Sequence, residues 1–445
     1  MATHGFVEEL ERHIAWQRVQ LKATDSAFHR FLVYRPGDRW TVCAHGPMRK
    51  RALHNPRLPG CQSAKDAFQK VKVGTAEYSG HWDDTVSGII PNFTRTSYTQ
   101  GLGNIMSGLV SATAVAILSR RILLVENWTT ASHSFGWPLT DLLLGSSGFE
   151  SSLLRAQGAG SRLDSFMAND DISAADELCS VNLLHHPRAR AWRMFSNQYF
   201  LNLLFLNPNH RKQLAAMGMP REGVLSPNVS PIWGPVLRFL LRPHDRLMQQ
   251  INHFEKNQLR PKGHERVVGM HLRCVLLDGR CPTRLLVRAA ECARERLAAL
   301  NATHFFIAAM HQSHRSFVAQ HLAHSTAQNT SILWYGDAVE YQDQNSMQED
   351  ARIADLVLLA RADEVLISMT STFGHMARGL ATGKPAFWFQ SCQMLPGEAT
   401  EPALHVTKDV FRAARHCRVG NVSVTKHESN IAALVNTGMI EHHIG

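Results

Sequence analysis

The sequence predicts an α/β protein of two domains that face each other across a cleft, with a doubly wound parallel sheet in the C-terminal domain. Two observations lead to this fold class. From residue 267 onward, short apolar runs alternate with longer runs of helical spacing, which is the rhythm of βαβ units. Earlier, a glycine-rich turn at 101–104 opens a helix of small and β-branched residues, and an apolar strand follows at 121–126. The 445 residues are enough for two or three domains.

The C-terminal half divides into strands and helices along its whole length. Each expected strand is a short apolar run, and each expected helix repeats apolar residues every three or four positions. The expected strands span 267–273, 303–310, 331–336, 364–369 and 384–389, and the helices span 283–300, 312–324 and 347–362, with a further short helix after the turn at 371–374. This order predicts a Rossmann-like domain.

The first half is richer in proline, serine and polar loops. The chain opens with the pattern of a charged amphipathic helix, and a helix-prone tract at 233–260 is expected to bridge the halves. The expected organisation is a poorly recognised N-terminal segment (1–90), an N-terminal α/β domain (91–260), a C-terminal Rossmann-like domain (261–395) and a C-terminal tail that packs back on the domains (396–445).

Composition and charge narrow the classes of function. Apolar residues make up 44% of the chain and charged residues 19%, which is typical of a folded protein. The net charge is +10, but Lys and Arg are spread along the chain without a basic block, so we expect no nucleic-acid partner. No run approaches the ~20 apolar residues of a membrane span, and the opening helix is not a signal peptide, so the sequence as written predicts no membrane anchor.

Cysteines and glycosylation motifs bear on the compartment. The eight cysteines form no CxxC pair, which argues against a zinc knuckle, and their even number permits disulfides. Asn-x-Ser/Thr motifs stand at Asn92, Asn127, Asn228, Asn301, Asn329 and Asn421. Together these features favour a secretory lumen.

A strand, a hydroxyl-rich turn and a helix meet at Ser371-Thr372-Phe373-Gly374. The two hydroxyls, the free N–H groups of a helix start and the helix dipole all favour a bound anion, whereas the simpler alternative is an ordinary N-cap. We expect Gly374 to let a ligand approach the backbone.

The run His271-Leu272-Arg273 ends another strand of the same sheet, at the carboxyl edge where open α/β sheets bind ligands. Strand alternation puts His271 and Arg273 on one face, and a guanidinium there is suited to a phosphate; a surface arginine at a strand end is the alternative. The turn Gly101–Asn104 is only a weak match to a phosphate loop, because it lacks GxGxxG and a GK[ST] ending.

Metal and covalent chemistry have no support in the sequence. One predicted helix carries His311, His314, His321 and His324, but without HExxH or a paired carboxylate we expect a solvated face. The chain has no Asp-x-Asp for a divalent cation and no GxSxG elbow. We therefore expect no metal, no cofactor and no covalent catalysis.

Several stretches together resemble the plant xyloglucan fucosyltransferase family, whose members transfer L-fucose from GDP-fucose. The similarity covers most of the chain from residue 100 onward, and its most specific part is the block around STFG. The stretches are GLGN with LSRRILLVEN (101–127), SNQYFLNLLFLNP (196–208), PIWGPVLRFLLRPHDRL (231–247), RVVGMHLR (266–273), ADLVLLARADEVLISMTSTFGHMARGLATGKPAFWF (354–389) and EPALH with a later Cys (401–417).

The resemblance implies a GT-B fold, two Rossmann-like domains facing a cleft, with metal-independent, inverting transfer. The C-terminal domain would hold GDP-fucose and the N-terminal one most of the acceptor. Arg273 would hold the β-phosphate as the catalytic residue, and His271 would lie near the nucleoside. The remaining donor-binding residues implied by the resemblance are Asp355 at the guanine or ribose, Ser371, Thr372, Phe373 and Gly374 at the pyrophosphate and fucose, and Gly103 and Asn104 from the opposite domain.

Three positions depart from the family pattern. Ile105 follows GLGN where the family usually has Arg, Ala403 replaces a Cys, and His271 replaces a Gln. The first puts a donor or acceptor contact in doubt, and the second puts one disulfide in doubt. The family's Golgi anchor is not visible, so we expect a Golgi-lumenal protein that contacts the membrane only if an anchor precedes this sequence.

In the mechanism that we expect, an acceptor hydroxyl attacks the anomeric carbon while GDP leaves from the other face, and Arg273 stabilises the charge that grows on the β-phosphate. Asp83, Asp84 and Asp141 are candidate bases, and nothing singles one out. A non-catalytic sugar-nucleotide or glycan-binding protein on the same fold is the main alternative. A dinucleotide enzyme is disfavoured because GxGxxG is absent. The acceptor, the linkage and the oligomeric state are left open.

Overall fold

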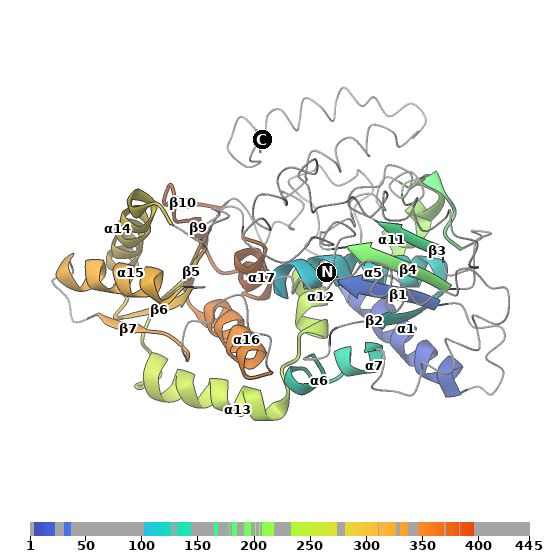
Figure 1. The fold of residues 1–445 in the computed structure, drawn as a ribbon, viewed down its shortest axis with the longest axis horizontal. Helices are drawn as coiled ribbons and strands as arrows, with labels where there is room; N and C mark the ends of the chain where they lie inside the picture. Colours follow the sequence, from blue (N-terminus) through green and yellow to red (C-terminus); the bar gives the residue numbers. More distant parts are fainter. Residues whose placement is uncertain are drawn as a thin grey trace, which may run out of the picture.

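The structure is a computed structural model. It describes residues 4–22, 31–36, 102–125, 128, 131–143, 164–167, 178, 180–184, 191–196, 201, 204, 207–217, 233–273, 281–309, 311–325, 330–336, 346–368, 371–381 and 383–395. Within these ranges the chain forms two sheets with helices packed around them, one at each end of the molecule (Figure 1). The expected pair of Rossmann-like units is therefore present.

The first sheet has four parallel strands in the order β2-β1-β4-β3. They are β1 (Phe31–Pro36), β2 (Ile122–Val125), β3 (Asp164–Met167) and β4 (Ala191–Ser196). The strand expected at 121–126 is β2, whereas β1, β3 and β4 were not foreseen. Residues 1–90 thus contribute an inner strand of this sheet, and the domain boundaries themselves stay a prediction.

Helix α1 (His4–Lys22), the expected opening helix, covers the edge of the first sheet beside β2. The Gln17 amide accepts from Leu123 N–H at 3.0 Å and donates to Leu123 C=O at 2.9 Å. His13 Nε2 lies 2.9 Å from the Arg121 carbonyl, and burial lowers the pKa of His13 to about 4, so its ring is neutral. Side chains of a helix thereby take the place of a further strand at this edge.

Helix α5 (Leu102–Ser119) is the expected helix after the glycine-rich turn, and it packs against β1, β2 and β4. It is long and apolar enough to cross a membrane, but 94% of it is buried inside the molecule. It is therefore a core helix of the first unit. The short elements near this unit are α6 (Ala131–Ser134), α7 (Leu139–Leu142), η2 (Pro208–His210) and α11 (Arg211–Ala216).

The second sheet has the order β10-β9-β8-β5-β6-β7 and is parallel except for β10. Its five parallel strands lie within the expected ranges and are each shorter than expected, β7 and β9 most of all, whereas β10 was not expected. They are β5 (Val267–Leu272), β6 (His304–Ala309), β7 (Ser331–Leu333), β8 (Glu364–Ile367) and β9 (Ala386–Trp388), with β10 (Gln393–Met394) added at the edge. The predicted Rossmann-like domain is confirmed.

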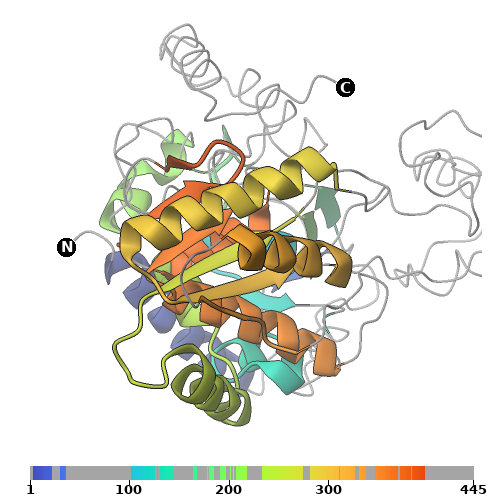
Figure 2. The same cartoon turned by 90° about the vertical axis from the view of Figure 1, so that its left-hand side faces the viewer.

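Helices cover both faces of this sheet. Helices α14 (Thr283–Leu300) and α15 (Gln312–Ser325) pack on one face, and α16 (Ser346–Arg361) and α17 (Thr372–Leu380) on the other (Figures 1 and 2). Alternate residues of β5 enter different cores: Met270 packs with α14, and Val267 packs with α16. A disulfide between Cys292 and Cys392 joins α14 to the turn after β9.

The helix-prone tract at 233–260 forms the expected bridge, as two helices and a π-helical turn. Helix α12 (Trp233–Leu240) packs on α17, α1 and α5, and α13 (Asp245–Phe254) packs on α16. Pro243 separates them because it cannot donate the helical N–H bond, and His244 caps α13. A π-helical turn, η3 (Glu255–Leu259), follows.

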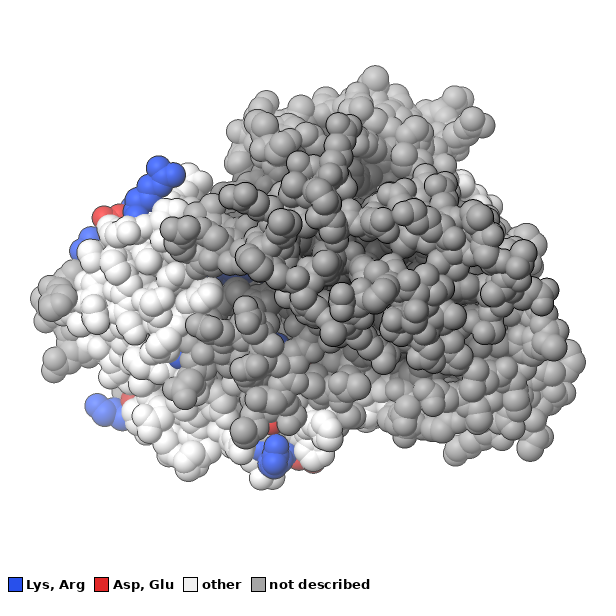
Figure 3. Space-filling view, in the orientation of Figure 1, with Lys and Arg blue, Asp and Glu red and all other residues white. Residues whose placement is uncertain are grey.

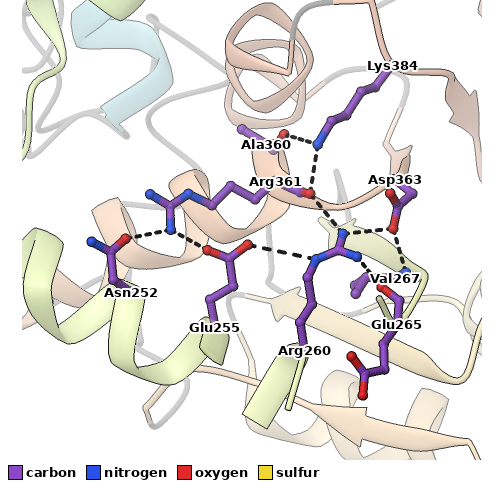
Figure 4. Close-up of polar contacts among 9 residues, drawn as sticks. All are labelled: Asn252, Glu255, Arg260, Glu265, Val267, Ala360, Arg361, Asp363 and Lys384. Atoms are coloured by element: carbon purple, nitrogen blue, oxygen red, sulfur yellow. Dashed lines mark hydrogen bonds and ion pairs between the residues drawn. The ribbon is translucent and has the colours of Figure 1, made fainter. Parts of the chain in front are cut away.

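Ion pairs anchor the end of this bridge to the amino edge of the second sheet (Figure 4). Glu255 lies between Arg361, at 2.5 Å, and Arg260, at 3.8 Å. Arg260 also pairs with Asp363 at 2.8 Å, and the same carboxylate oxygen accepts from Val267 N–H at 2.8 Å. The end of the bridge, from residue 255 onward, is therefore attached to the second sheet.

Gly234 of α12 and Gly379 of α17 allow these two helices to cross at close range. A Cβ at Gly234 would lie 2.4 Å from the Gly379 carbonyl oxygen, and one at Gly379 would lie 2.7 Å from the Trp233 ring. The nearest group to Gly234 is backbone and the nearest to Gly379 is the buried Trp233 ring, so neither can easily move aside. This crossing fixes α17 against the bridge.

We predict that Gly234→Ala lowers the free energy of unfolding by about 1–3 kcal/mol, the usual cost of overpacking. The measurement is urea denaturation followed by circular dichroism. Gly136→Ala is the matched control, because a Cβ there meets only the Arg242 carbonyl oxygen at 3.7 Å. Equal stability of the two variants would show that α12 and α17 separate without cost.

Candidate functional site

The two sequence motifs meet at the carboxyl edge of the second sheet. Strand β5 pairs with β8 up to His271 and Ile367, so the ends of both strands emerge side by side. His271 and Arg273 come from the first strand end, and Ser371 follows the second at the start of α17. The adjacency expected from parallel strands is therefore present.

Ser371 is the N-cap of α17 and is fully buried. Its Oγ accepts from Gly374 N–H at 3.2 Å and lies 3.0 Å from His271 Nδ1. The Ser371 hydroxyl is buried, and Nδ1 is the acceptor for its proton among the described residues, so we assign the ring hydrogen to Nε2. The Ser371 hydroxyl is therefore an ordinary N-cap and also part of the predicted site.

His271 is a neutral group inside the site. It is 5% exposed, and its ring lies 4.7 Å from the Phe373 ring, tilted by 32°. Burial, aided by the charge of Arg273, lowers the pKa of His271 to about 3. An imidazole in this state offers a hydrogen-bond donor and an apolar face rather than a positive charge.

Arg273 carries the positive charge at this edge. It is half-buried, and among the described residues its guanidinium has no hydrogen-bond or ion-pair partner. Its main chain is held by Ser368, whose Oγ accepts from Arg273 N–H at 3.0 Å. Sequence reasoning missed Ser368, because one serine at a strand end has no distinguishing pattern.

The first unit reaches the site through the start of α5. Asn104 Oδ1 accepts from Thr372 Oγ1 at 2.7 Å, and a Cβ at Gly103 would lie 2.6 Å from the same hydroxyl and 2.7 Å from Phe373 N. Gly103 and Asn104 therefore contact the first turn of α17 directly. The Thr372 proton is committed to Asn104, which leaves this hydroxyl as an acceptor.

The structure gives a different reason for a glycine at position 374 from the one that the sequence suggests. A Cβ at this position would lie 2.9 Å from Ile367 Cβ and 3.6 Å from His271 Nδ1. The missing side chain therefore lets α17 pack against β8, and the expected space for a ligand is filled by the protein itself.

Asp355 lies on α16, on the face of the second sheet that also carries α17. Its Oδ1 is buried and has no hydrogen-bond partner among the described residues. Burial raises the pKa of Asp355 to about 8, against the opposing charge of Arg315. Arg315 is itself buried on α15, where it donates to the Gly336 carbonyl at 3.0 Å and lies over the Trp334 ring at 5.6 Å. A buried carboxyl oxygen of this kind is a ready acceptor for the N–H groups of a ligand.

Ile105 and Asp141, two residues that the sequence analysis singled out, pack or pair within the protein itself. Ile105 is 9% exposed and belongs to the core, so the position where the family has arginine lies at the margin of packed side chains. Asp141 forms an ion pair with Arg18 on α1, which occupies one candidate base. Asp83 and Asp84 lie outside the described residues, as does Ala403.

The histidines of α15 are not all on a solvated face. His314 is 9% exposed and packs against His311 at 4.9 Å between ring centroids. That expectation is therefore wrong for His314, whose side chain is buried. Within the described part of the chain, no three His, Cys, Asp or Glu side chains gather as a metal site.

Charges on the surface drawn in Figure 3 lie in separate groups. The described Lys and Arg side chains there stand apart from one another, most of them beside Asp or Glu. On this face the described residues therefore form no continuous basic patch.

Comparisons with known proteins agree with this architecture. A curated relative, probable fucosyltransferase 8 of Arabidopsis thaliana, is 24% identical over 330 residues. The match covers 64% of this chain, and the chain spans 62% of the length of that relative. No family model matches the sequence.

A solved structure, of a mutant of Arabidopsis thaliana FUT1 in complex with GDP, superposes with a TM-score of 0.53 at 13% identity. It covers 86% of this chain and 78% of that one. The chain has the GT-B fold. The expected fold class and the resemblance to plant fucosyltransferases are both confirmed.

The buried histidine gives a prediction for stability against pH. The folded pKa of His271, about 3, lies below its ordinary value of 6.5, so the unfolded chain binds a proton that the folded chain excludes. The stability cost is absent above pH 6.5 and grows as the pH falls toward 3. Between pH 7 and pH 5 we expect this group to lower the free energy of unfolding by about 2 kcal/mol.

The measurement is chemical denaturation of the wild type and His271→Gln at both pH values. Gln keeps a polar side chain without a titrating ring, so His271→Gln should lose about 2 kcal/mol less than the wild type on acidification. His13 remains in both proteins and cancels. Parallel losses in the two proteins would rule out a neutral, buried His271.

Proposed function

We propose that the chain is an inverting fucosyltransferase that moves L-fucose from GDP-fucose to a hydroxyl of a cell-wall-type glycan, xyloglucan-like and through an α-1,2 linkage. The observation that carries the proposal is the meeting of Arg273, the Ser371-capped start of α17 and Asn104 at one edge of a GT-B fold. A guanidinium that has no partner within the described part of the chain, at the same edge as a helix N-terminus, is suited to a pyrophosphate.

In the proposed mechanism, Arg273 and the first turn of α17 bind the β-phosphate. Departure of GDP leaves negative charge on that phosphate and positive charge on the fucose ring, so contacts to the phosphate strengthen as the bond breaks. His271 stays neutral and offers Nε2–H and its ring face to the donor. Asp355 would accept the N–H groups of guanine, for which its unpartnered oxygen is suited.

We propose that no metal or cofactor takes part, because Arg273 and α17 supply the charge that a cation otherwise provides. Asp83 and Asp84 stay the candidate bases for the proton of the acceptor hydroxyl, since Asp141 is paired with Arg18.

We further propose a Golgi-lumenal location. Cys292 and Cys392 form a disulfide, and disulfides persist in the oxidising secretory pathway. Asn301, in an Asn-x-Ser/Thr motif, is exposed at the end of α14, which suits it to glycosylation.

A non-catalytic sugar-nucleotide or glycan-binding protein on the same fold is the second candidate. Ile105 favours it, because this position has an apolar, nearly buried residue where the resembling family has arginine. The two candidates differ in turnover. GDP-fucose binding without GDP release on any glycan would support the second.

Arg273 should be needed for turnover. Arg273→Ala should lower kcat for GDP release from GDP-fucose by about 100- to 1,000-fold, which corresponds to the ~2.7–4 kcal/mol of one lost transition-state donor. The assay compares GDP-fucose with GDP-mannose and UDP-galactose, with and without xyloglucan, in EDTA. Digestion of the product with an α-1,2-specific fucosidase tests the linkage.

Arg12→Ala is the matched control, because Arg12 is an exposed residue of α1 that pairs only with Glu9. It should turn over like the wild type. Near-full turnover by Arg273→Ala would sink the catalytic assignment, and loss of activity in EDTA would contradict the metal-free mechanism.

Asp355 should make GDP binding depend on pH. Its pKa of about 8 means that the carboxyl is mostly protonated at pH 7, whereas guanine N–H groups bind best to the carboxylate. From pH 7 to pH 8.5, GDP affinity should therefore rise on the order of ten-fold in the wild type. Asp355→Asn should bind GDP more weakly and without this rise.

Calorimetry with GDP on both proteins over the same pH range provides the measurement, since titration of the nucleotide itself cancels between them. The same pH dependence in Asp355→Asn would remove Asp355 from the base site.

A further inference from the structure

Strands β5 and β8 stop pairing two residues before Arg273. Their last register pair is His271 with Ile367. Beyond it, the main chain of Arg273 has no ladder partner on β8. Buried main-chain groups nevertheless need hydrogen bonds, so something must replace the ladder at this point.

The Ser368 side chain replaces it. Its Oγ accepts from Arg273 N–H at 3.0 Å and donates to the Arg273 carbonyl at 2.9 Å, with the His271 carbonyl as a more distant acceptor at 3.3 Å. Ser368 is fully buried, so water does not compete for these groups. A single hydroxyl thus binds both main-chain groups of Arg273.

Ser368 also bonds to the turn that leads into α17, on the other side of the site. Its carbonyl accepts from Ser371 N–H at 3.1 Å, at the entry to α17. The same residue therefore fixes the main chain below the guanidinium and the turn that leads to the helix cap. The distance between these two anion-binding groups depends on it.

We propose that Ser368 is a positioning residue, whose hydroxyl fixes the main chain from which Arg273 reaches the phosphate. The proposal rests on the proposed function, because that function gives Arg273 its phosphate. Ser368 does not itself contact the donor. Its effect passes through Arg273, so removing the hydroxyl should matter only while the guanidinium is present.

A double-mutant cycle on the full chain tests this coupling, with GDP affinity measured by calorimetry. In the wild-type background, Ser368→Ala should weaken GDP binding about ten-fold, the scale of one well-placed hydrogen bond. In the Arg273→Ala background, the same substitution should change GDP affinity less than two-fold. An equal loss in both backgrounds would overturn the proposal, because it would show a general structural effect.

Ser119→Ala is the matched control, since Ser119 is equally buried but bonds only within α5, to Val115 O at 2.6 Å and Ala116 O at 3.4 Å. It should bind GDP like the wild type. Ser368→Thr and Ser368→Val form a second pair that differs in the hydroxyl but not in shape. We expect Thr to bind like the wild type and Val like Ala.

Equal GDP affinity of the Thr and Val variants would overturn the positioning role even if Ser368→Ala does not fold. Failure of the wild type to bind GDP would instead overturn the proposed function, and this inference with it. Wild-type binding with an unaffected Ser368→Ala would overturn only the role of Ser368.

Discussion

The placement of α17 is the constraint on which the rest of the structure depends. Three glycine contacts bring its backbone close to its neighbours. Gly374 allows β8 to approach, Gly103 brings α5 onto its first turn, and Gly234 meets Gly379 where α12 crosses it. Close backbone contacts of this kind leave little freedom to shift. The N-terminus of α17 is therefore held between the two units, where both can contribute to one site.

The electrostatics of the site follow from this burial. A protonated imidazole beside Arg273 would be costly away from water, so His271 is neutral and bonds to Ser371. Positive charge at the edge then comes from the guanidinium and the start of the helix. The helix start and the main chain of Arg273 are both held by Ser368 before a ligand arrives, which is the arrangement that favours charge developing on a leaving group.

Much of the second unit could be predicted from sequence, because its strands are apolar on both faces and its helices are long enough for clear periodicity. The same reasoning failed for β1, β3 and β4, whose short apolar runs stand in a part of the sequence rich in polar residues. It also gave the wrong reason for Gly374 and the wrong exposure for His314. The contact between Gly374 and Ile367 depends on how α17 folds back against β8, and the exposure of His314 depends on how its helix is turned.

The sequence by itself determined the order of strands and helices in the second unit, the strand ends at His271–Arg273 and Ser371, and the absence of a dinucleotide fingerprint. These are local patterns, and local periodicity is what a sequence records. Only the tertiary structure decided that Asn104 bonds Thr372, that Ser368 holds Arg273, and that Asp355 keeps a carboxyl oxygen without a partner among the described residues. Such contacts depend on packing between segments far apart in the chain, which no pattern along it specifies.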